Sequence, residues 1–406
     1  MKDPRFFEGV DPAELAAAYG TPLYIYNERV FRTRCREMKN LVSYPNFRVN
    51  YSVKANANLT LLKIAHEEGL LADAMSPGEI FVEEQAGFLP EEIFYISNNV
   101  SVSEMAYAVE RGITVSIDSL SQLERFGKNF PGAAVSLRIN SGVGAGHSAK
   151  VVTGGKLTKF AITPDQLDEA RAIIQKYGIR LAGLNQHIGS FFLEKEIYLE
   201  GVHALLDIAK DFPDLDFIDL GGGFGMPYDT SSQSRLDLEQ LGKALDEVFN
   251  SFAASYGKNI LFKIEPGRYI SAESGILMGT VEAIKENAGR LYCGTDLGFN
   301  TLIRPMLYEA YHQIETWPPR PEAEIHPYTV VGNICESGDI LAKDRPLPDM
   351  QEDDLVLVHD AGAYGFSMAS NYNNRLRPAE VLISEDGSVR LIRRRDTLED
   401  LIRNFP

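Results

Sequence analysis

Polar side chains that could do chemistry follow several short apolar runs of this sequence. Lys54 ends the run "RVNYSVK", Asp73 lies in "LADAM", and His187 lies near the end of "LAGLNQHI". Glu265 and Arg268 follow in "LFKIEPGR". A lysine at the inner end of a buried strand either extends its ammonium to water or uses its amine in a reaction. The set lacks the clusters of His and carboxylate that bind metals, so we expect amine chemistry and no metal site.

The elements that must position these residues alternate between strand-like and helix-like segments. Between the apolar runs lie stretches with apolar residues at helical spacing, several of which open on Asn, Thr or Ser and close on Gly. Such alternation predicts a parallel sheet, and eight repeats favour a (β/α)8 TIM barrel, although an open doubly wound sheet stays possible. In a barrel of this kind chemistry occurs at the C-terminal ends of the strands. The eight runs are 48–54, 71–75, 93–97, 113–118, 134–140, 181–188, 217–221 and 261–266.

Beyond about residue 275 the pattern changes to strand-like runs with few helices between them. This predicts a C-terminal antiparallel β-barrel or sandwich domain. We therefore expect a (β/α)8 barrel over residues 30–275 and a β domain over 276–406, joined by the N-terminal strand segment 1–29. The long Gly-rich stretch 140–162 is typical of an active-site loop.

Composition excludes several classes of protein. With 40 basic and 57 acidic residues the net charge is −17, which disfavours nucleic acid and anionic membranes as partners. No apolar run approaches the roughly 20 residues that a membrane span needs. The first residues lack the pattern of a signal peptide, and three widely spaced cysteines argue against a disulfide framework or zinc site. These features are typical of the cytoplasm.

The strand-end residues match the needs of pyridoxal 5′-phosphate. This cofactor needs a lysine for a Schiff base, a carboxylate at the pyridine nitrogen, backbone N–H groups for the phosphate and an aromatic plane on the ring. Lys54, Glu265, the turn in "DLGGGFG" and His187 can fill these roles in that order. Each alone has a simpler interpretation, such as a solvent-reaching lysine, an interior histidine or a packing glycine. The glycine turn also lacks the G-x-G-x-x-G spacing of a dinucleotide site.

Eight motifs in order make the sequence similar to the fold-type III, alanine-racemase-like, pyridoxal-phosphate-dependent decarboxylases. The motifs are "YSVKAN", "DAMSPGEI", "QHIGS", "DLGGGFG", "EPGRYI", "DLGFNTLIRPMLYEAYH", "ICESGDILAKDR" and "DAGAYGFSMASNYNNRLRPAEVL". They run from residue 51 to residue 382, and the final "LIRRRDTLEDLI" also matches. The resemblance implies a homodimer in which each active site is shared between two subunits.

The resemblance also implies individual roles. Lys54, His187, Glu265 and Cys335 would be catalytic, with Cys335 as the proton donor that the other subunit supplies together with Glu336. Cofactor contacts would come from Lys54, Asp73, His187, Ser190, Gly222, Gly223, Glu265, Gly267, Arg268 and Tyr364. Substrate contacts would come from Arg268, Arg304, Tyr308, Glu336 and Tyr364.

The activity implied is decarboxylation of meso-2,6-diaminopimelate at its D-configured centre, giving L-lysine and CO2. A sibling decarboxylase acting on ornithine, lysine, arginine or carboxynorspermidine is the alternative. Arg304 disfavours it, because a substrate without a distal carboxylate would leave a buried cation unpaired. An amino-acid racemase would usually have Arg where this chain has Glu265. An inactive regulatory relative would have lost Lys54, Glu265 or Cys335, and all three are present.

Overall fold

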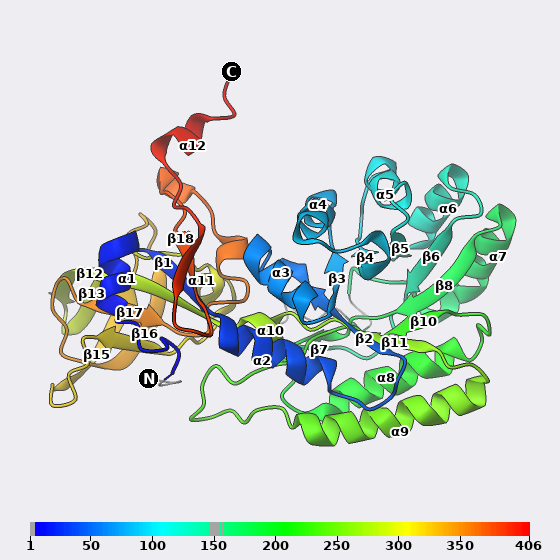
Figure 1. Cartoon of the computed structure of the whole chain (residues 1–406), viewed down its shortest axis with the longest axis horizontal. Coiled ribbons are helices and arrows are strands. Elements are labelled where there is room, and N and C mark those ends of the chain that lie inside the picture. The colour runs from blue at the N-terminus through cyan, green and yellow to red at the C-terminus, as the bar shows by residue number, and fades with distance from the viewer. Residues whose placement is uncertain (1–4, 147–153, 156–157) are drawn as a thin grey trace. The chain divides into compact units, whose positions relative to one another are not determined.

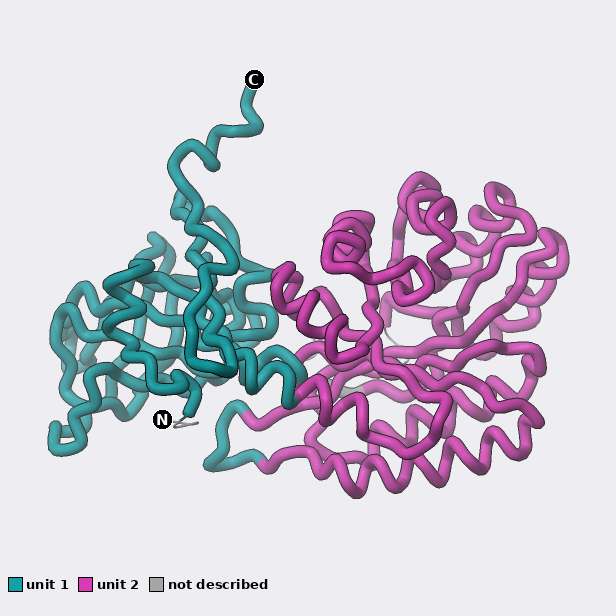
Figure 2. Tube along the Cα trace, viewed as in Figure 1, with its two compact units in different colours: residues 1–33, 228–233, 270–406 teal, residues 34–227, 234–269 magenta. Residues whose placement is uncertain are grey.

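The chain divides into two compact units, which Figure 2 distinguishes by colour. The computed structural model describes residues 5–146, 154–155 and 158–406. Unit 1 comprises residues 1–33, 228–233 and 270–406, and unit 2 comprises residues 34–227 and 234–269. The domain boundaries that the sequence suggests, at 29/30 and 275/276, remain a prediction. Much of the expected active-site loop at 140–162 lies outside the described residues.

Unit 2 contains a closed barrel of parallel strands (Figure 1). The order around the barrel follows the chain, and β8 pairs with β10 to continue the ring. This confirms the predicted (β/α)8 barrel and rules out the open sheet. The strands are β2 (Phe47–Ser52), β3 (Leu71–Ala74), β4 (Ile93–Ile96), β5 (Thr114–Ile117), β6 (Ala134–Arg138), β8 (Arg180–Asn185), β10 (Phe217–Asp219) and β11 (Leu261–Ile264).

Helices separate the barrel strands, and polar caps mark where several begin. Asn58 accepts a hydrogen bond from Thr60 N, and Ser76 accepts one from Glu79 N, as N-cap residues do. The helices are α2 (Glu28–Lys39), α3 (Leu59–Glu67), α4 (Pro77–Ala86), α5 (Val102–Val109), α6 (Leu120–Asn129), α7 (Leu167–Tyr177), α8 (Lys195–Ala209), α9 (Leu238–Tyr256) and α10 (Arg268–Ser271). The remaining short elements are the 3-10 turns Val53–Ala55, Pro90–Glu92 and Pro164–Gln166 and the paired strands β7 (Ala145–Gly146) and β9 (Gly189–Ser190).

Large side chains fill the barrel interior. The rings of Phe94 and Phe217 meet edge to face with centroids 5.3 Å apart, and the Lys263 ammonium lies 4.5 Å from the Phe217 ring centroid. Gly183 is opposite Phe217 in the ladder, and a Cβ there would lie 2.5 Å from the phenyl ring. Glycine at 183 therefore makes room for the Phe217 side chain.

Unit 1 contains a nine-stranded, branched sheet built mostly from antiparallel pairs. Two pairs are parallel, β1 with β18 and β13 with β15. Strand β12 pairs with β1, β13 and β17, and β14 extends the branch through β17. The strands are β1 (Leu23–Asn27), β12 (Gly275–Asn287), β13 (Arg290–Thr295), β14 (Ile314–Trp317), β15 (Ile325–Val331), β16 (Ile340–Pro348), β17 (Leu355–Val358), β18 (Ala379–Ile383) and β19 (Val389–Arg393).

A hydrophobic core forms against this sheet, with Ile25, Met278 and Val381 fully buried. Helix α1 (Pro12–Tyr19) contributes Leu15 to the same cluster. The remaining helical elements of unit 1 are α11 (Arg304–Tyr308), α12 (Leu398–Ile402) and the 3-10 turns Phe366–Met368 and Tyr372–Asn374.

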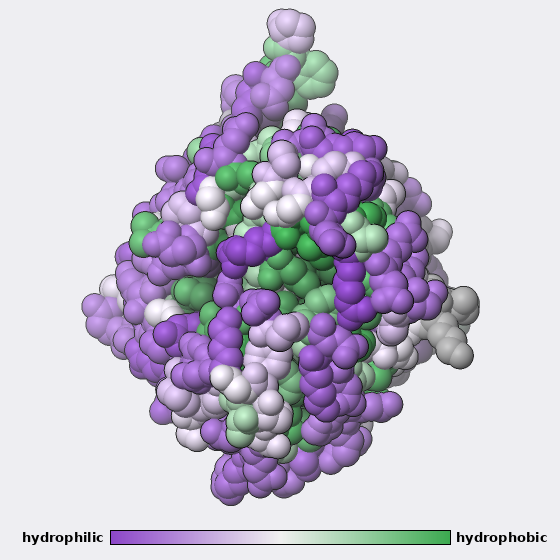
Figure 3. Space-filling model, turned by 90° about the vertical axis from the view of Figure 1, so that its right-hand side faces the viewer, coloured by the Kyte–Doolittle hydropathy of each residue, from purple (hydrophilic) through white to green (hydrophobic). Residues whose placement is uncertain are grey.

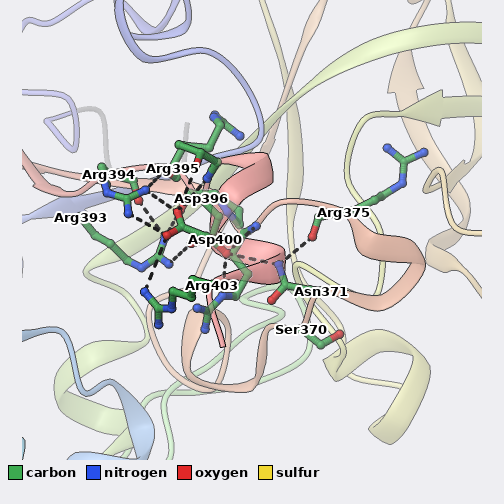
Figure 4. Close-up of polar contacts among 12 residues, drawn as sticks. Ser370, Asn371, Arg375, Arg393, Arg394, Arg395, Asp396, Asp400 and Arg403 are labelled. Carbon is green, nitrogen blue, oxygen red and sulfur yellow. Dashed lines mark hydrogen bonds and ion pairs between the residues drawn. The ribbon is translucent and has the colours of Figure 1, made fainter. Parts of the chain in front are cut away.

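Arginine side chains near the C-terminal end of the chain form ion pairs with aspartate side chains of the same region (Figure 4). Arg394 donates to Asp400 at 2.5 and 2.9 Å. Arg377 donates to Asp396 at 3.0 Å. Arg393 also bonds to Asp396. The Arg394–Asp400 pair holds the short helix α12 to the residue that follows β19.

The surface drawn in Figure 3 is mostly hydrophilic, with apolar residues gathered near the centre of that face. Within the described part of the chain, no helix has both the length and the apolar character to traverse a bilayer.

Candidate active site

The barrel brings nine of the predicted site residues to the C-terminal ends of its strands, where parallel strands of a closed barrel converge. Each follows directly on the end of a strand or lies near it. They are Lys54 after β2, Asp73 on β3, His187 and Ser190 after β8, Gly222 and Gly223 after β10, and Glu265, Gly267 and Arg268 after β11.

Glu265 lies at the centre of this group and is 3% exposed. Burial raises its pKa well above the ordinary value, and Asp219 and Asp73 raise it further, while Lys54 and Arg138 partly offset the shift. Its Oε1 has no hydrogen-bond partner among the described residues. A buried carboxyl oxygen without a donor is costly, so the site is built for a donor that the polypeptide does not itself supply.

His187 contacts Glu265, with 3.7 Å between Nδ1 and Oε2. The backbone N–H of Gly222 donates to the same Nδ1 at 3.2 Å, so this nitrogen is an acceptor and carries no proton. Burial, with Lys54 and Arg138, holds the pKa of His187 well below its ordinary value. The contact with Glu265 is therefore made by a neutral imidazole and is not an ion pair.

Lys54 and Asp73 also belong to this group. Asp73 is fully buried and accepts a hydrogen bond from Ser52 Oγ at 2.6 Å. Burial raises the pKa of Asp73, and the Lys54 ammonium, the Ser52 hydroxyl and Arg138 lower it in part. The lysine is thus close enough to interact electrostatically with Asp73, Glu265 and His187.

The glycine turn leaves no room for side chains. A Cβ at Gly222 would lie 1.9 Å from the Glu265 carbonyl oxygen, and one at Gly223 would lie 2.3 Å from the Phe192 ring. Gly223 also has φ +104°, which favours glycine. This turn presents backbone close to the strand ends, an arrangement that suits anion binding.

The positively charged side chain of Arg268 lies beside the glycine turn. Arg268, 5% exposed, donates from Nη2 to Ser190 Oγ at 3.0 Å. A Cβ at Gly267 would lie 2.9 Å from the Ser52 side chain, so glycine lets α10 begin close to the end of β2. Arg268 and Ser190 thus form a polar, positively charged pair that suits a phosphate.

The other five predicted residues lie in unit 1. Arg304 is 2% exposed on α11, and its guanidinium carbon lies 5.1 Å from the Tyr228 ring centroid and 5.9 Å from that of Tyr364. Tyr364 adopts φ +56°, an uncommon conformation for a residue other than glycine. Tyr308, also on α11, is half-buried.

Cys335 and Glu336 are exposed on the segment between β15 and β16. Asn373 Nδ2 donates to Cys335 Sγ at 2.9 Å, and the Tyr372 hydroxyl donates to Glu336 Oε1 at 2.7 Å. Tyr372 and Asn373, which are adjacent in the sequence, thus contact the adjacent residues Glu336 and Cys335, respectively.

Sequence reasoning did not assign roles to Arg138, Asn373 or His312. Arg138 is 6% exposed, and burial lowers its pKa while Glu265, Asp118 and Asp73 raise it. Its only sequence signal is a charge within the apolar run 134–140. Asn373 and His312 lie within the family motifs quoted above, but their spacing from other residues does not indicate a role.

Comparison with known proteins gives the family. Residues 28–272 match the family model "Pyridoxal-dependent decarboxylase, pyridoxal binding domain". The diaminopimelate decarboxylase of Methanothermobacter thermautotrophicus is 40% identical over 404 residues, covering 97% of this chain and 94% of that protein.

The chain belongs to the pyridoxal-dependent decarboxylases. The Escherichia coli diaminopimelate decarboxylase is 33% identical over 96% of this chain and 94% of its own length. The crystal structure of Helicobacter pylori diaminopimelate decarboxylase with L-lysine superimposes with a TM-score of 0.88 at 31% identity, covering 97% of this chain and 98% of that chain. A Vibrio vulnificus lysine/ornithine decarboxylase at 21% identity and TM-score 0.79 shares the fold.

The barrel residues fit pyridoxal phosphate, the cofactor of this family. The unpartnered Oε1 of Glu265 can accept a hydrogen bond from a protonated pyridine nitrogen. The glycine turn, Ser190 and Arg268 can hold a phosphate. Lys54 can supply the amine, and His187 can supply a neutral ring.

Proposed function

We propose that this pyridoxal-dependent decarboxylase removes the D-centre carboxylate of meso-2,6-diaminopimelate and releases L-lysine and CO2. Arg304 is the observation that carries the choice of substrate. A buried guanidinium near two tyrosine rings suits a distal carboxylate, whereas the chain of ornithine or L-lysine, once its α-carboxylate is oriented for removal, offers no second carboxylate. The named relatives support the same choice.

Bound pyridoxal phosphate supplies an aldehyde for amines and a ring that accepts the electron pair left when CO2 departs. Lys54 would hold the cofactor covalently, and Glu265 would keep the pyridine nitrogen protonated. His187 would supply the ring that stacks on the cofactor, with Asp73 near it. Ser190, Gly222, Gly223, Gly267, Arg268 and Tyr364 would bind the phosphate.

Further residues orient the substrate. Arg304 and Tyr308 bind the distal carboxylate end, Glu336 contacts the distal ammonium, and Arg268 and Tyr364 contribute from the cofactor side. Cys335 delivers a proton to the carbon that has lost CO2. Because Cys335 and Glu336 are exposed in the single chain, we propose that they act in the site of a second copy, within a cytoplasmic homodimer.

The substrate is tested by CO2 release from meso-diaminopimelate, L-lysine, L-ornithine and D-amino acids. We expect turnover of meso-diaminopimelate and at most traces with the others. Preferred turnover of L-ornithine or L-lysine would instead establish the sibling activity.

The shared site is tested by mixing inactive homodimers. Lys54→Ala and Cys335→Ala homodimers should each be nearly inactive, and exchange should restore roughly a quarter of wild-type activity when half of the dimers are mixed. Lys54→Ala mixed with Glu265→Ala is the matched control, because both lesions lie in the barrel and no intact site can form. No recovery in the first mixture, with exchange verified by mass, would contradict a site shared between subunits.

A further inference from the structure

We propose that His312 is the residue that positions the Arg304 guanidinium, and that it thereby sets the selectivity for ligands that carry a distal carboxylate. This inference rests on the proposed function. Arg304 and His312 are both buried, at 2% and 1% exposure, and both belong to unit 1. Arg304 Nε donates to His312 Nε2 at 3.3 Å.

The hydrogen bonds around the His312 ring define its tautomer. Arg304 Nε–H is a donor under all conditions, so His312 Nε2 must accept and carries no proton. The ring proton then lies on Nδ1, which donates to the carbonyl oxygen of His359 at 2.8 Å. His359 directly follows β17, so the backbone at the end of a sheet strand orients the imidazole.

Further contacts hold His312 from its other sides. Arg345 Nη1 donates to the His312 carbonyl oxygen at 2.8 Å. The Tyr228 ring meets the imidazole edge to face with centroids 5.2 Å apart. Since Tyr228 also lies beside the Arg304 guanidinium, one ring packs against both members of the pair. The imidazole is therefore a rigid acceptor for Arg304.

This arrangement determines which edge of the guanidinium meets a carboxylate. Because Nε is bonded to His312, a carboxylate must bind at the Nη1–Nη2 edge of Arg304. The bond also fixes the plane of the fork, so that bidentate binding requires little reorganisation. Without an acceptor at position 312, the buried Nε–H would be unsatisfied or the side chain would turn.

The binding affinities of two ligands distinguish a role of His312 in positioning Arg304 from a general role in packing. L-lysine and cadaverine differ only in the carboxylate that Arg304 would bind. Losing a well-oriented hydrogen bond to a charged group weakens binding about ten- to a hundredfold. We therefore expect His312→Asn to weaken L-lysine binding by this factor and to leave cadaverine binding within about twofold. The Asn side chain can still donate to His359 but is too short to accept from Arg304.

His312→Gln is the conservative variant. Its amide oxygen and nitrogen are spaced like the two ring nitrogens, so it should retain most of the preference for L-lysine. His312→Phe keeps a ring without an acceptor and should behave like His312→Asn. His326→Gln, on β15 of the same unit, is the control and should leave both affinities unchanged.

The measurements are calorimetric binding of both ligands, kcat and KM for meso-diaminopimelate, and thermal midpoints. We expect His312→Asn to raise KM more than it lowers kcat. If His312→Phe does not fold, the Asn and Gln variants decide the question.

Equal losses of L-lysine and cadaverine affinity, or an unchanged preference in His312→Asn, would overturn the proposal even in an enzyme that decarboxylates meso-diaminopimelate. If the wild type releases no CO2 but shows the expected binding pattern, the proposed function fails and the role of His312 stands.

Discussion

Glu83 is a buried carboxyl group whose protonation should control the stability of the barrel. It lies on α4, is 0% exposed, and has no hydrogen-bond partner for either oxygen among the described residues. Burial, followed by the charges of Asp73, Glu79 and Glu84, raises the pKa of Glu83 from 4.5 to about 9. At neutral pH this side chain is therefore an uncharged acid within the fold.

The sign of the effect on stability follows from linkage. The folded state binds this proton more tightly than the unfolded chain, so the stabilisation is complete below pH 4.5 and is lost as the pH rises towards 9. Glu83→Gln removes the titration with little change of shape. At about 1.4 kcal/mol per pH unit, its stability relative to wild type should increase by about 3 kcal/mol between pH 5.5 and 7.5.

Thermal unfolding by calorimetry at several pH values measures this difference. A change of 3 kcal/mol corresponds to about 6 °C in the relative midpoint for a unit of this size. Glu84→Gln is the matched control, because Glu84 is its chain neighbour, is 28% exposed and pairs with Arg111 at 3.1 Å. A constant difference between wild type and Glu83→Gln across this pH range would refute a proton held by Glu83.

Three further predictions concern the active site. Gly222→Ala should weaken cofactor binding at least tenfold by equilibrium dialysis, because the new Cβ would lie 1.9 Å from the Glu265 carbonyl oxygen. Lys54→Ala should abolish the borohydride-reducible attachment of the cofactor, which mass spectrometry detects; a retained attachment would place the amine elsewhere. Asn373→Leu should slow alkylation of Cys335 at pH 7 several-fold, since it removes an N–H that donates to the thiol sulfur. An unchanged alkylation rate would show that this hydrogen bond does not affect the reactivity of Cys335.

Much of the fold could be predicted from the sequence, because its barrel strands are marked by local patterns. The run 48–54 corresponds to β2 (Phe47–Ser52), and the run 261–266 contains β11 (Leu261–Ile264). The direction of pairing in unit 1 was harder to predict. β1 and β18 are parallel neighbours although more than 350 residues separate them, and strand patterns do not encode the partner of a strand.

The site was partly predictable for the same reason. Lys54 and Glu265 stand at strand ends, where a barrel must bring them together, whereas the partner of Arg304 is chosen by tertiary packing. Glu83 shows the limit most clearly. In "EIFVEEQ" two adjacent glutamates look alike, and only the packing of α4 decides that Glu83 is buried and Glu84 is partly exposed.

The ionisable groups in the barrel interior influence one another's pKa, so their protonation must be considered together. Asp219, fully buried, has a pKa raised to about 7 by burial, and the Gly221 N–H and Lys263 limit that rise. Burial likewise lowers the pKa of Lys263, which Asp219 and Glu265 raise. Each group resists ionisation alone and is helped by an oppositely charged neighbour. A protonated pyridine nitrogen beside Glu265 would be such a neighbour, so cofactor binding and ionisation of Glu265 should favour one another.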